Sequence, residues 1–390
     1  MVITRSRRAP ITLVALAVLG ACTGSNPPAA APSGSSPSAA PTSPTPTPSP
    51  TTFLADGTPL PPGCEDRRPA RAQTVAFAAD GRIWALDPTS GRLSCLLEST
   101  DPGPFLWGPR GDRVLLSDFQ VAGWRAAPSS APSGVQPAIA DWGHPVGIAI
   151  VFARANARHP QKFFLASDRT TTLRDLPAAS YLDVAYHPTG LALAFILQRN
   201  GSQSIWFSTN EGEQAKQLVF TEEGTTFSDV TFTHDGESLV YIAHHAQGYS
   251  ELHTIDLARP NTLNSVWKGP VGEYARTVAP SPDDRAFAVT EGKSCAKSRA
   301  AILLGHHRQR RLVPGAGRPS SVLGWLDPQT VLVGVGGCGH PMDLYTVPAT
   351  GTTGPSVLVR GVSAAASRAP EPAHASLPKE VQLDTGSGIG

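Results

Sequence analysis

The stretches YHPTGLALAF, residues 186–195, and FTHDGESLVYI, residues 232–242, decide the fold. Each begins with an aromatic residue, continues through a short turn rich in Pro, Asp or Gly, and ends in an apolar run typical of a β-strand. Asp and Gly suit such a turn, because Gly tolerates a positive φ and Asp hydrogen-bonds to its own backbone. The two stretches therefore predict β-hairpins built to one plan.

The plan recurs at WGPRGDRVLL (107–116), PSPDDRAFAV (280–289) and WLDPQTVLV (325–333). From residue 186 onward the copies begin at positions 186, 232, 280 and 325, so the intervals are 46, 48 and 45 residues. Most copies are followed by an alternating strand such as SIWFS (204–208), and then by a final short strand such as SVLV (356–359). Four antiparallel strands in a period of roughly 45 residues are typical of one blade of a β-propeller.

The complete unit resembles the TolB-type, WD40-like β-propeller repeat of bacterial lipoproteins. It consists of aromatic-x-Pro-Asp-Gly, an aliphatic strand and Ile-Trp-x-x-Asp, and the last part stands as Ile83-Trp84-Ala85-Leu86-Asp87 in the first blade. The resemblance covers most of residues 70–365 and implies an all-β fold of four-stranded antiparallel blades. The copies at Trp107 and Trp325 lack the Asp-Gly, and the second and third blades are degenerate, with a Pro- and Ser-rich sequence between Ala126 and Pro137.

The predicted second strands indicate seven blades, with six or eight as alternatives. These strands start near Thr74, Arg113, Val146, Leu191, Ser238, Arg285 and Thr330. The first blade has no obvious innermost strand before residue 70, so we expect the other end of the chain to close the ring. Residues 379–383, in the tail 366–390, are the nearest strand-like stretch. Such closure hides strand edges that would otherwise pair with other chains.

The first 22 residues have the three parts of an export signal. Three arginines form a basic start, residues 11–19 form an apolar run too short to span a bilayer, and Leu19-Gly20-Ala21-Cys22 resembles the bacterial lipobox. We therefore expect a signal peptide over residues 1–21 and a lipid on Cys22, which holds the protein on the outer side of the cell membrane. Both the Sec and the twin-arginine export routes are compatible with this signal. High Ala, Pro and Arg usage with little Lys favours an actinobacterial source.

Residues 22–62 consist of the lipidated cysteine and a segment made almost entirely of Pro, Ser, Thr, Ala and Gly. Such a segment has too little apolar surface to offset the entropy of ordering it, so we expect a disordered stalk. The propeller domain is expected over residues 63–365. The chain has 32 basic and 31 acidic residues, and its net charge of +1 favours neither nucleic acid nor an anionic surface as a partner.

Four cysteines remain beyond Cys22, an even number in a chain expected outside the reducing cytosol. They predict two disulfides, and three pairings are possible. Cys64 with Cys95 and Cys295 with Cys338 closes the shortest loops and agrees with the repeat register. In that register the second bond joins the loops that follow the second strands of two neighbouring blades. A metal site is not expected, because no cysteines or histidines stand at the spacing of metal ligands.

Several motifs that resemble binding or catalytic sites favour structural roles. GVGGCG (334–339) matches a dinucleotide-binding glycine pattern, but a strand follows it where a phosphate-binding helix would be needed. Adjacent histidines at 244–245 and 306–307 point to opposite faces of a strand, so neither pair chelates an ion easily. The other candidates, expected to hold turns or to pack blades together, are Asp87, Asp256, Trp84, Trp206 and Trp325.

The sequence contains no Gly-x-Ser-x-Gly nucleophile elbow. The tail after the propeller is also shorter than the hydrolase domain that prolyl oligopeptidase-type peptidases carry beside a similar propeller. We therefore expect no enzymatic activity, no catalytic residue, no cofactor and no metal.

The resemblance implies a function, because TolB-like proteins bind other envelope proteins. We expect a lipid-anchored, non-catalytic propeller that acts as a protein-binding or scaffold module at the cell envelope. The alternative is a propeller enzyme, or a carbohydrate- or small-ligand-binding protein, whose site would show acidic or aromatic side chains converging in the central channel. The face that carries Cys295 and Cys338 is the expected binding face.

Overall fold

The computed structural model describes residues 52–64, 69–70, 73–99 and 375–376, and residues 103–368 with short gaps. The gaps are 104, 109–110, 112, 117–120, 124–125, 130–134, 144–147, 156–160, 167–170, 176–179, 210–214, 221–223, 261, 306–308, 314–316 and 351–353. Between residues 121 and 175, side chains are described only at Asp141 and Trp142. Residues 1–51, which include the predicted signal peptide and Cys22, lie outside the described residues.

The described strands form seven antiparallel sheets, six of four strands and one of five. The seven innermost strands are β29 (Ala364–Ser367), β5 (Leu106–Trp107), β9 (Val135–Gly143), β13 (Ser180–Tyr186), β17 (Thr225–Phe232), β21 (Ala275–Pro280) and β25 (Ser320–Asp327). The second strands are β2 (Val75–Ala79), β6 (Arg113–Leu115), β10 (Ile148–Ala155), β14 (Ala192–Arg199), β18 (Ser238–His245), β22 (Ala286–Glu291) and β26 (Thr330–Gly336).

The outer half of each sheet is built in the same order. The third strands are β3 (Arg82–Leu86), β7 (Val121–Gly123), β11 (Gln161–Ala166), β15 (Ser202–Thr209), β19 (Ser250–Asp256), β23 (Arg299–Leu304) and β27 (Met342–Pro348). The fourth strands are β4 (Leu93–Glu98), β8 (Ala126–Ser129), β12 (Thr171–Asp175), β16 (Lys216–Phe220), β20 (Leu263–Lys268), β24 (Gln309–Leu312) and β28 (Ser356–Val362). A short strand, β1 (Phe53–Leu54), is the fifth strand of the last sheet.

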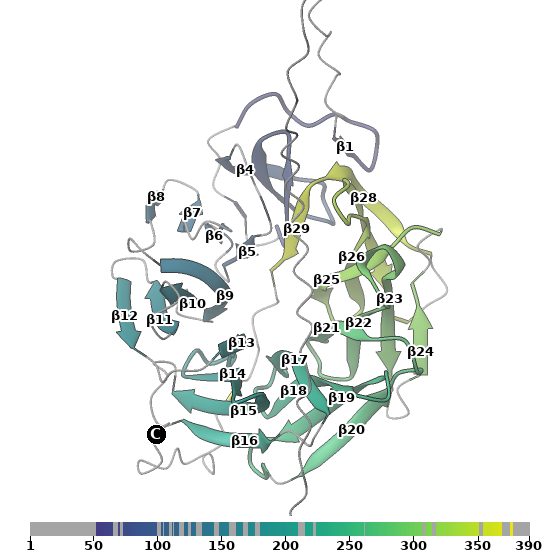
Figure 1. Cartoon of the computed structure of the whole chain (residues 1–390). Helices are drawn as coiled ribbons and strands as arrows, with labels where there is room; N and C mark the ends of the chain where they lie inside the picture. Colours follow the sequence, from purple (N-terminus) through teal and green to yellow (C-terminus); the bar gives the residue numbers. More distant parts are fainter. Residues whose placement is uncertain are drawn as a thin grey trace, which may run out of the picture. The chain divides into compact units, whose positions relative to one another are not determined.

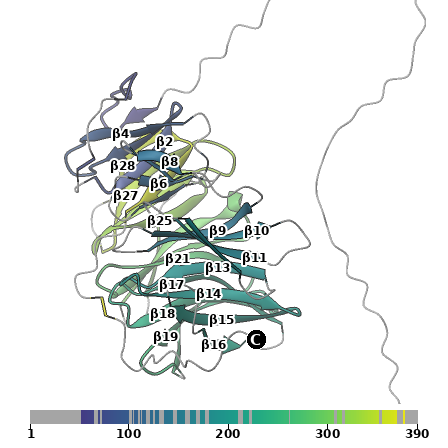
Figure 2. The same cartoon turned by 90° about the vertical axis from the view of Figure 1, so that its left-hand side faces the viewer.

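The innermost strands contact one another in a closed circle. Contacts run from β29 to β5, β9, β13, β17, β21 and β25, and from β25 back to β29. Figure 1 shows the sheets radiating from a common centre, with β4, β12, β16, β20 and β24 at the periphery. Figure 2 shows the sheet of β13 to β16 lying beside that of β9 to β11, in agreement with the contact between β9 and β13. The predicted all-β propeller fold is confirmed.

The strand that closes the ring differs from the expected one. Strand β29 pairs with β2, from Val75 opposite Ser367 to Ala78 opposite Ala364. The chain therefore completes the first sheet directly after β28, and the predicted closing stretch, residues 379–383, lies outside the described residues. The sequence AAAS of β29 has no strand-like pattern of its own, so its conformation depends on the unpaired edge of β2.

The chain enters the propeller earlier than the predicted stalk boundary allows. Phe53 and Leu54, within the expected stalk, pair with Arg360 and Val359 of β28. Leu60 is buried and packs in the same cluster as Val359. The stalk prediction is therefore wrong for residues 52–60, because their few apolar side chains cover the outer edge and flank of the last sheet.

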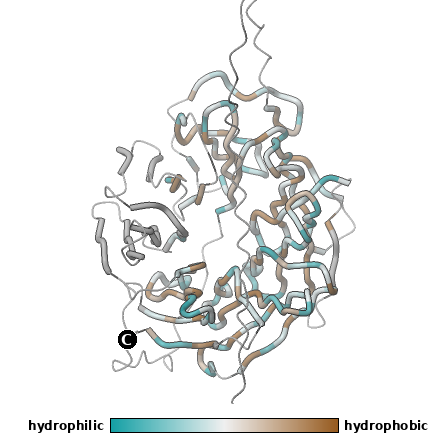
Figure 3. The backbone as a smooth tube through the Cα atoms, in the orientation of Figure 1, coloured by the Kyte–Doolittle hydropathy of each residue, from teal (hydrophilic) through white to brown (hydrophobic). Residues whose placement is uncertain are grey.

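The hydrophobic core lies between neighbouring sheets. Every residue of β2 and of β22 is buried, and the sequence is a continuous apolar run over all of β2 and over residues 286–289 of β22. One cluster joins β14 and β15 to β17 and β18, and another joins the first sheet to the last. Figure 3 shows apolar segments in each of the coloured sheets. No helix among the described residues has the length and hydrophobicity needed to cross a membrane.

Two disulfides fasten the propeller. Cys64 is bonded to Cys95, which ties the entering chain to β4. Cys295 is bonded to Cys338, which joins the loop after β22 to the loop after β26 in the neighbouring sheet. Both bonds have the pairing that the sequence favoured, and Cys295 begins a single 3-10 turn, Cys295–Lys297.

Candidate functional site

A cavity of about 440 Å³ lies at the centre of the ring. Six of the seven innermost strands contribute to its wall, namely β5, β9, β13, β17, β25 and β29. A smaller cavity of about 190 Å³ adjoins it, shares Phe232, His234 and Ser367, and is lined by the seventh innermost strand, β21. The larger volume lies in the roughly 300–1,000 Å³ range of small-ligand pockets. The centre of the propeller is therefore large enough to hold a ligand.

Aromatic side chains form much of the cavity wall. They are Phe105, Trp107, Trp142, Tyr186 and Phe232. Trp107, Tyr186 and Phe232 are the residues that open the repeated hairpin plan, and each ends an innermost strand. This position places them beside the channel. The repeat identified these aromatic residues as features of the fold but not as residues of a cavity. The sequence pattern alone does not show which strand of each sheet is innermost.

Three polar atoms of these aromatic residues are buried without a hydrogen-bond partner. They are Nε1 of Trp107, Nε1 of Trp142 and the hydroxyl of Tyr186. Trp107 and Tyr186 are only 6% and 7% exposed. Leaving such a group unpaired costs roughly 1–3 kcal/mol, and buried polar groups in proteins are generally paired. All three residues line the cavity, so a ligand that offers hydrogen-bond acceptors would satisfy these groups there after a side-chain shift that exposes them.

The cavity also has one carboxyl group, that of Asp141, and one guanidinium, that of Arg368, in its wall. Burial raises the pKa of Asp141 to about 6, although the backbone N–H of Tyr186 donates a hydrogen bond of 2.8 Å to its carboxyl. The guanidinium carbon of Arg368 lies 5.7 Å from the ring centre of Trp107. The guanidinium of Arg368 also lies against Gly111, whose φ of +73° favours glycine. Acidic and aromatic side chains thus meet in the channel, as the alternative hypothesis requires.

Asp141 is the first of three aspartates on neighbouring innermost strands. Asp183 of β13 accepts a hydrogen bond of 2.7 Å from the N–H of Val230 in the next sheet, and Asp229 of β17 accepts one from the N–H of Val278. Burial raises the pKa of Asp183 to about 7 and that of Asp229 well above its ordinary value, and in each case the preceding aspartate adds to the rise. These carboxyls tie each sheet to the following one.

The expected binding face is not the one on which the cavity lies. Six of the seven innermost strands end at the turns that lead into the second strands, and Trp107, Tyr186 and Phe232 lie at those ends. Cys295 and Cys338 follow the second strands and therefore lie at the opposite mouth of the channel. The cavity therefore does not support the predicted face, and the loops at one mouth gave no information about the channel interior.

The other residues singled out in the sequence have structural contacts. Asp87 accepts hydrogen bonds from the N–H groups of Thr89 and Ser90, and Asp256 accepts one from Ala258. Trp84 and Trp325 are buried, and Nε1 of Trp206 donates a hydrogen bond to the hydroxyl of Ser204. The glycine-rich residues 334–339 are followed by strand β27. Nε1 of Trp325 donates to the carbonyl of Ala279 in the neighbouring sheet. His306 and His307 lie outside the described residues.

No protein-family model and no curated protein matches the chain. Among solved structures, the chain is similar to a prolyl endopeptidase, with a TM-score of 0.55 and 13% identity over 76% of this chain and 50% of that one. It is similar to the β-propeller domain of Cps50 (Swd1) from Myceliophteria thermophila, with a TM-score of 0.50 and 14% identity over 69% and 91%. TolB from Acinetobacter baumannii matches with a TM-score of 0.44 and 14% identity over 78% and 68%.

The chain spans half of the length of the prolyl endopeptidase that it matches. The prediction that the chain is not an enzyme is corrected, because the chain is similar in fold to a prolyl endopeptidase, which is a catalytic protein. At identities of 13% and 14% these similarities concern the fold, which is that of a β-propeller.

Proposed function

We propose that the protein is a lipid-anchored β-propeller on the outer side of the cell membrane, and that it binds an envelope or cell-surface protein through its central cavity. The observation that carries the binding site is the group of three unpaired donors, on Trp107, Trp142 and Tyr186, around one aromatic cavity. The support for the anchor is the lipobox-like sequence that ends at Cys22.

A polypeptide segment has the chemistry that this cavity requires. Its backbone carbonyls are hydrogen-bond acceptors for indole N–H and phenol O–H groups, and its apolar side chains pack on aromatic rings. The cavity lies where the innermost strands end, so a partner that covers this mouth of the channel can insert a loop or a chain end. Aromatic anchors in a desolvated pocket are the residues that contribute most to protein interfaces.

A second candidate is a carbohydrate or other small ligand, bound or converted in the same cavity. The observation that favours it is the convergence of five aromatic side chains with Asp141 in a space of about 440 Å³. Asp141 has a pKa of about 6, so its carboxyl changes protonation near neutral pH. Such a group can exchange a proton with a bound molecule.

Tyr186→Phe tests the cavity without enlarging it. The variant removes only a hydroxyl that has no partner, so we expect unchanged thermal stability and a loss of about two- to tenfold in affinity for the ligand, the worth of one hydrogen bond. Tyr274→Phe is the matched control, since Tyr274 is exposed and is not among the residues that line either central cavity.

The experiment captures partners from solubilised membranes with the full chain and with both variants, and screens glycans and metabolites by thermal shift. A captured protein that binds the Tyr186→Phe variant more weakly, but not the Tyr274→Phe variant, supports protein binding in the cavity. A small molecule that stabilises the full chain and not the Tyr186→Phe variant, with no such protein, supports the second candidate. Ligands that bind both variants equally exclude the cavity as the site.

A further inference from the structure

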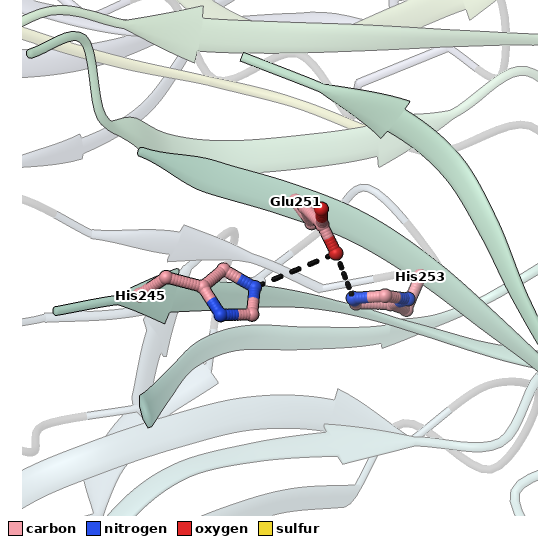
Figure 4. Close-up of side chains that lie close together, drawn as sticks. All are labelled: His245, Glu251 and His253. Atoms are coloured by element: carbon pink, nitrogen blue, oxygen red, sulfur yellow. Dashed lines mark ion pairs between the residues drawn. The ribbon is translucent and has the colours of Figure 1, made fainter. Parts of the chain in front are cut away.

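Three side chains that sequence spacing did not connect meet on one face of the β18–β19 hairpin. The strand pairing places Ala243 opposite Glu251 and Tyr241 opposite His253. His245 follows Ala243 by two residues, so it lies on the same face of the sheet as Glu251 and His253. Figure 4 shows both imidazole rings directed at the carboxylate of Glu251. The partners of His245 are Glu251 and His253 on the neighbouring strand, not the adjacent His244. The expectation that adjacent histidines cannot chelate one ion therefore does not apply to these three residues.

The distances fit a tetrahedral metal ion. Oε2 of Glu251 lies 3.4 Å from Nε2 of His245 and 3.2 Å from Nε2 of His253. Zn²⁺ binds nitrogen and carboxylate oxygen at roughly 2.0–2.2 Å, so neighbouring ligand atoms of a tetrahedral site are about 3.4 Å apart. One ligand atom from each residue lies within 4.8 Å of the other two.

The surroundings of His245 also suit metal binding, whereas Nδ1 of His253 is buried without a hydrogen-bond partner. Nε2 of His245 faces the carboxylate, is buried and has no hydrogen bond, while Nδ1 of the same ring lies 3.5 Å from the Thr225 hydroxyl. Metal-binding histidines generally use the second nitrogen in this way. His253 stacks on Tyr241, which fixes its ring, with the ring centres 5.3 Å apart. Burial lowers the pKa of His253, which favours the neutral ring that coordinates a metal.

One nearby cation must be accommodated. Lys268 of β20 lies 3.2 Å from Oε1 of Glu251, whereas the histidines approach Oε2. The Lys268 side chain is 58% exposed and Glu251 is 16% exposed. The ammonium can therefore remain in solvent while the inner oxygen serves as a ligand, although its charge reduces the affinity for a metal cation.

We propose that His245, Glu251 and His253 bind one divalent transition-metal ion of the Zn²⁺ type. Two imidazoles and a carboxylate fill three positions and leave the fourth for water or an exogenous ligand. The site lies where β18 ends, outside the strands that surround the central cavity, and it is independent of the proposed function. It joins the second and third strands of one sheet.

The test uses the full chain after treatment with a chelator, with Zn²⁺ binding measured by calorimetry and Co²⁺ binding by visible absorption. We expect one ion per chain and the intense absorption of tetrahedral Co²⁺. His253→Gln and Glu251→Gln should each lower the affinity by at least the 10- to 100-fold that loss of an outer-sphere partner costs. Glu237→Gln and His340→Gln, at exposed positions, are the matched controls and should bind as the unmodified chain does.

A fourth variant separates a metal site from a simple ion pair. Lys268→Met removes the competing ammonium and should raise the Zn²⁺ affinity roughly two- to fivefold, even if the ligand variants fold poorly. Absence of stoichiometric Zn²⁺ binding would overturn the proposal. The proposal would also be overturned if neither the ligand variants nor Lys268→Met changed the Zn²⁺ affinity. A Co²⁺ spectrum typical of an octahedral, water-rich complex would overturn it as well.

Discussion

Asp141, Asp183 and Asp229 show how single residues hold the ring together. Each follows the same rule, in which a carboxyl of one innermost strand accepts a hydrogen bond from a backbone N–H of the next sheet. For Val230 this N–H lies within an irregularity of the strand pairing, between residues 228 and 231. The carboxyl therefore satisfies a buried donor that the strand ladder leaves unpaired.

The buried carboxyl of Asp183 should make stability depend on pH. In the folded protein its pKa is raised to about 7 from 3.8, so the folded state holds a proton that the unfolded chain releases between these values. Its contribution to stability is full below about pH 4 and is lost as the pH rises through 7. The difference between the two pKa values corresponds to a change on the order of 4 kcal/mol in the free energy of unfolding.

Asp183→Asn removes this titration. We expect the free energy of unfolding of the variant, relative to the unmodified protein, to rise between pH 4 and pH 8, because only the unmodified protein loses stability there. Urea unfolding at both pH values measures the change, with the exposed Asp80→Asn as the control. A difference between variant and unmodified protein that stays constant with pH would contradict the assigned burial of Asp183.

Gly236 is a position where a side chain is excluded for two separate reasons. Its φ of +76° is unfavourable for any other residue, and a Cβ there would collide with Nε2 of His187, which bonds to the Gly236 carbonyl at 2.9 Å. Gly57 has a similar φ of +84° but open space around it. Gly57→Ala should cost roughly 1–2 kcal/mol for the backbone alone.

Gly236→Ala should cost more than Gly57→Ala, since the contact between the two sheets is lost as well. The free energies of unfolding of both variants, measured in urea, give the comparison. Equal losses would show that His187 yields without cost, and that the bond between its ring and the Gly236 carbonyl contributes nothing to the stability of the ring.

At the scale of the strand, β29 is the element on which closure of the ring depends. It covers the edge of β2, a strand whose residues are all buried. A chain that ends at Ser363 should leave this edge exposed and should unfold or aggregate, whereas a chain that ends at Ser376 keeps β29 and is the matched control. Thermal unfolding and light scattering of the two purified chains test the difference. Equal behaviour of both chains would show that β29 is dispensable.

Strand positions could be predicted from the sequence where apolar runs are long. The predicted starts near Leu191, Ser238 and Arg285 lie within one residue of the first residues of β14, β18 and β22. These second strands are buried on both faces and are therefore rich in apolar residues, which makes them visible in the sequence. Strand β29, four small residues, could not be predicted, since its conformation is imposed by a partner almost 300 residues earlier. Strand β1 was missed for a similar reason.

The central site was only partly predictable. The repeat gave Trp107, Tyr186 and Phe232, but placing them in one cavity requires knowing which strand is innermost and where it ends. The aspartates carried a signal that pattern analysis could have used. Asp183 and Asp229 each stand three residues before the aromatic of a repeat, at Tyr186 and Phe232. The repeat was defined as starting at the aromatic residue, so these aspartates lay outside it.

For the molecule as a whole, Cys22 determines whether the propeller is retained at the membrane. If two or more acyl chains on this residue form the anchor, Cys22→Ala should move most of the protein from the membrane fraction to the soluble extracellular fraction. Thr23→Ala, at the next residue, should leave the distribution unchanged. Fractionation followed by immunoblotting measures both variants, and a Cys22→Ala protein that stays with the membrane would disprove lipid attachment at this position.

The closing strand also sets the order of events when the protein is made. The hydroxyl of Ser363 bonds to the carbonyl of Ala78 across 285 residues of chain, while the other innermost strands pair with a second strand that follows them by a short turn. The sheets of β9, β13, β17 and β21 can thus form as they emerge, but the first sheet must wait for residues 364–367. Completion of the ring is therefore a late step in folding. Until residues 364–367 have been synthesised, the edge of β2 stays unpaired and can pair with a strand of another chain.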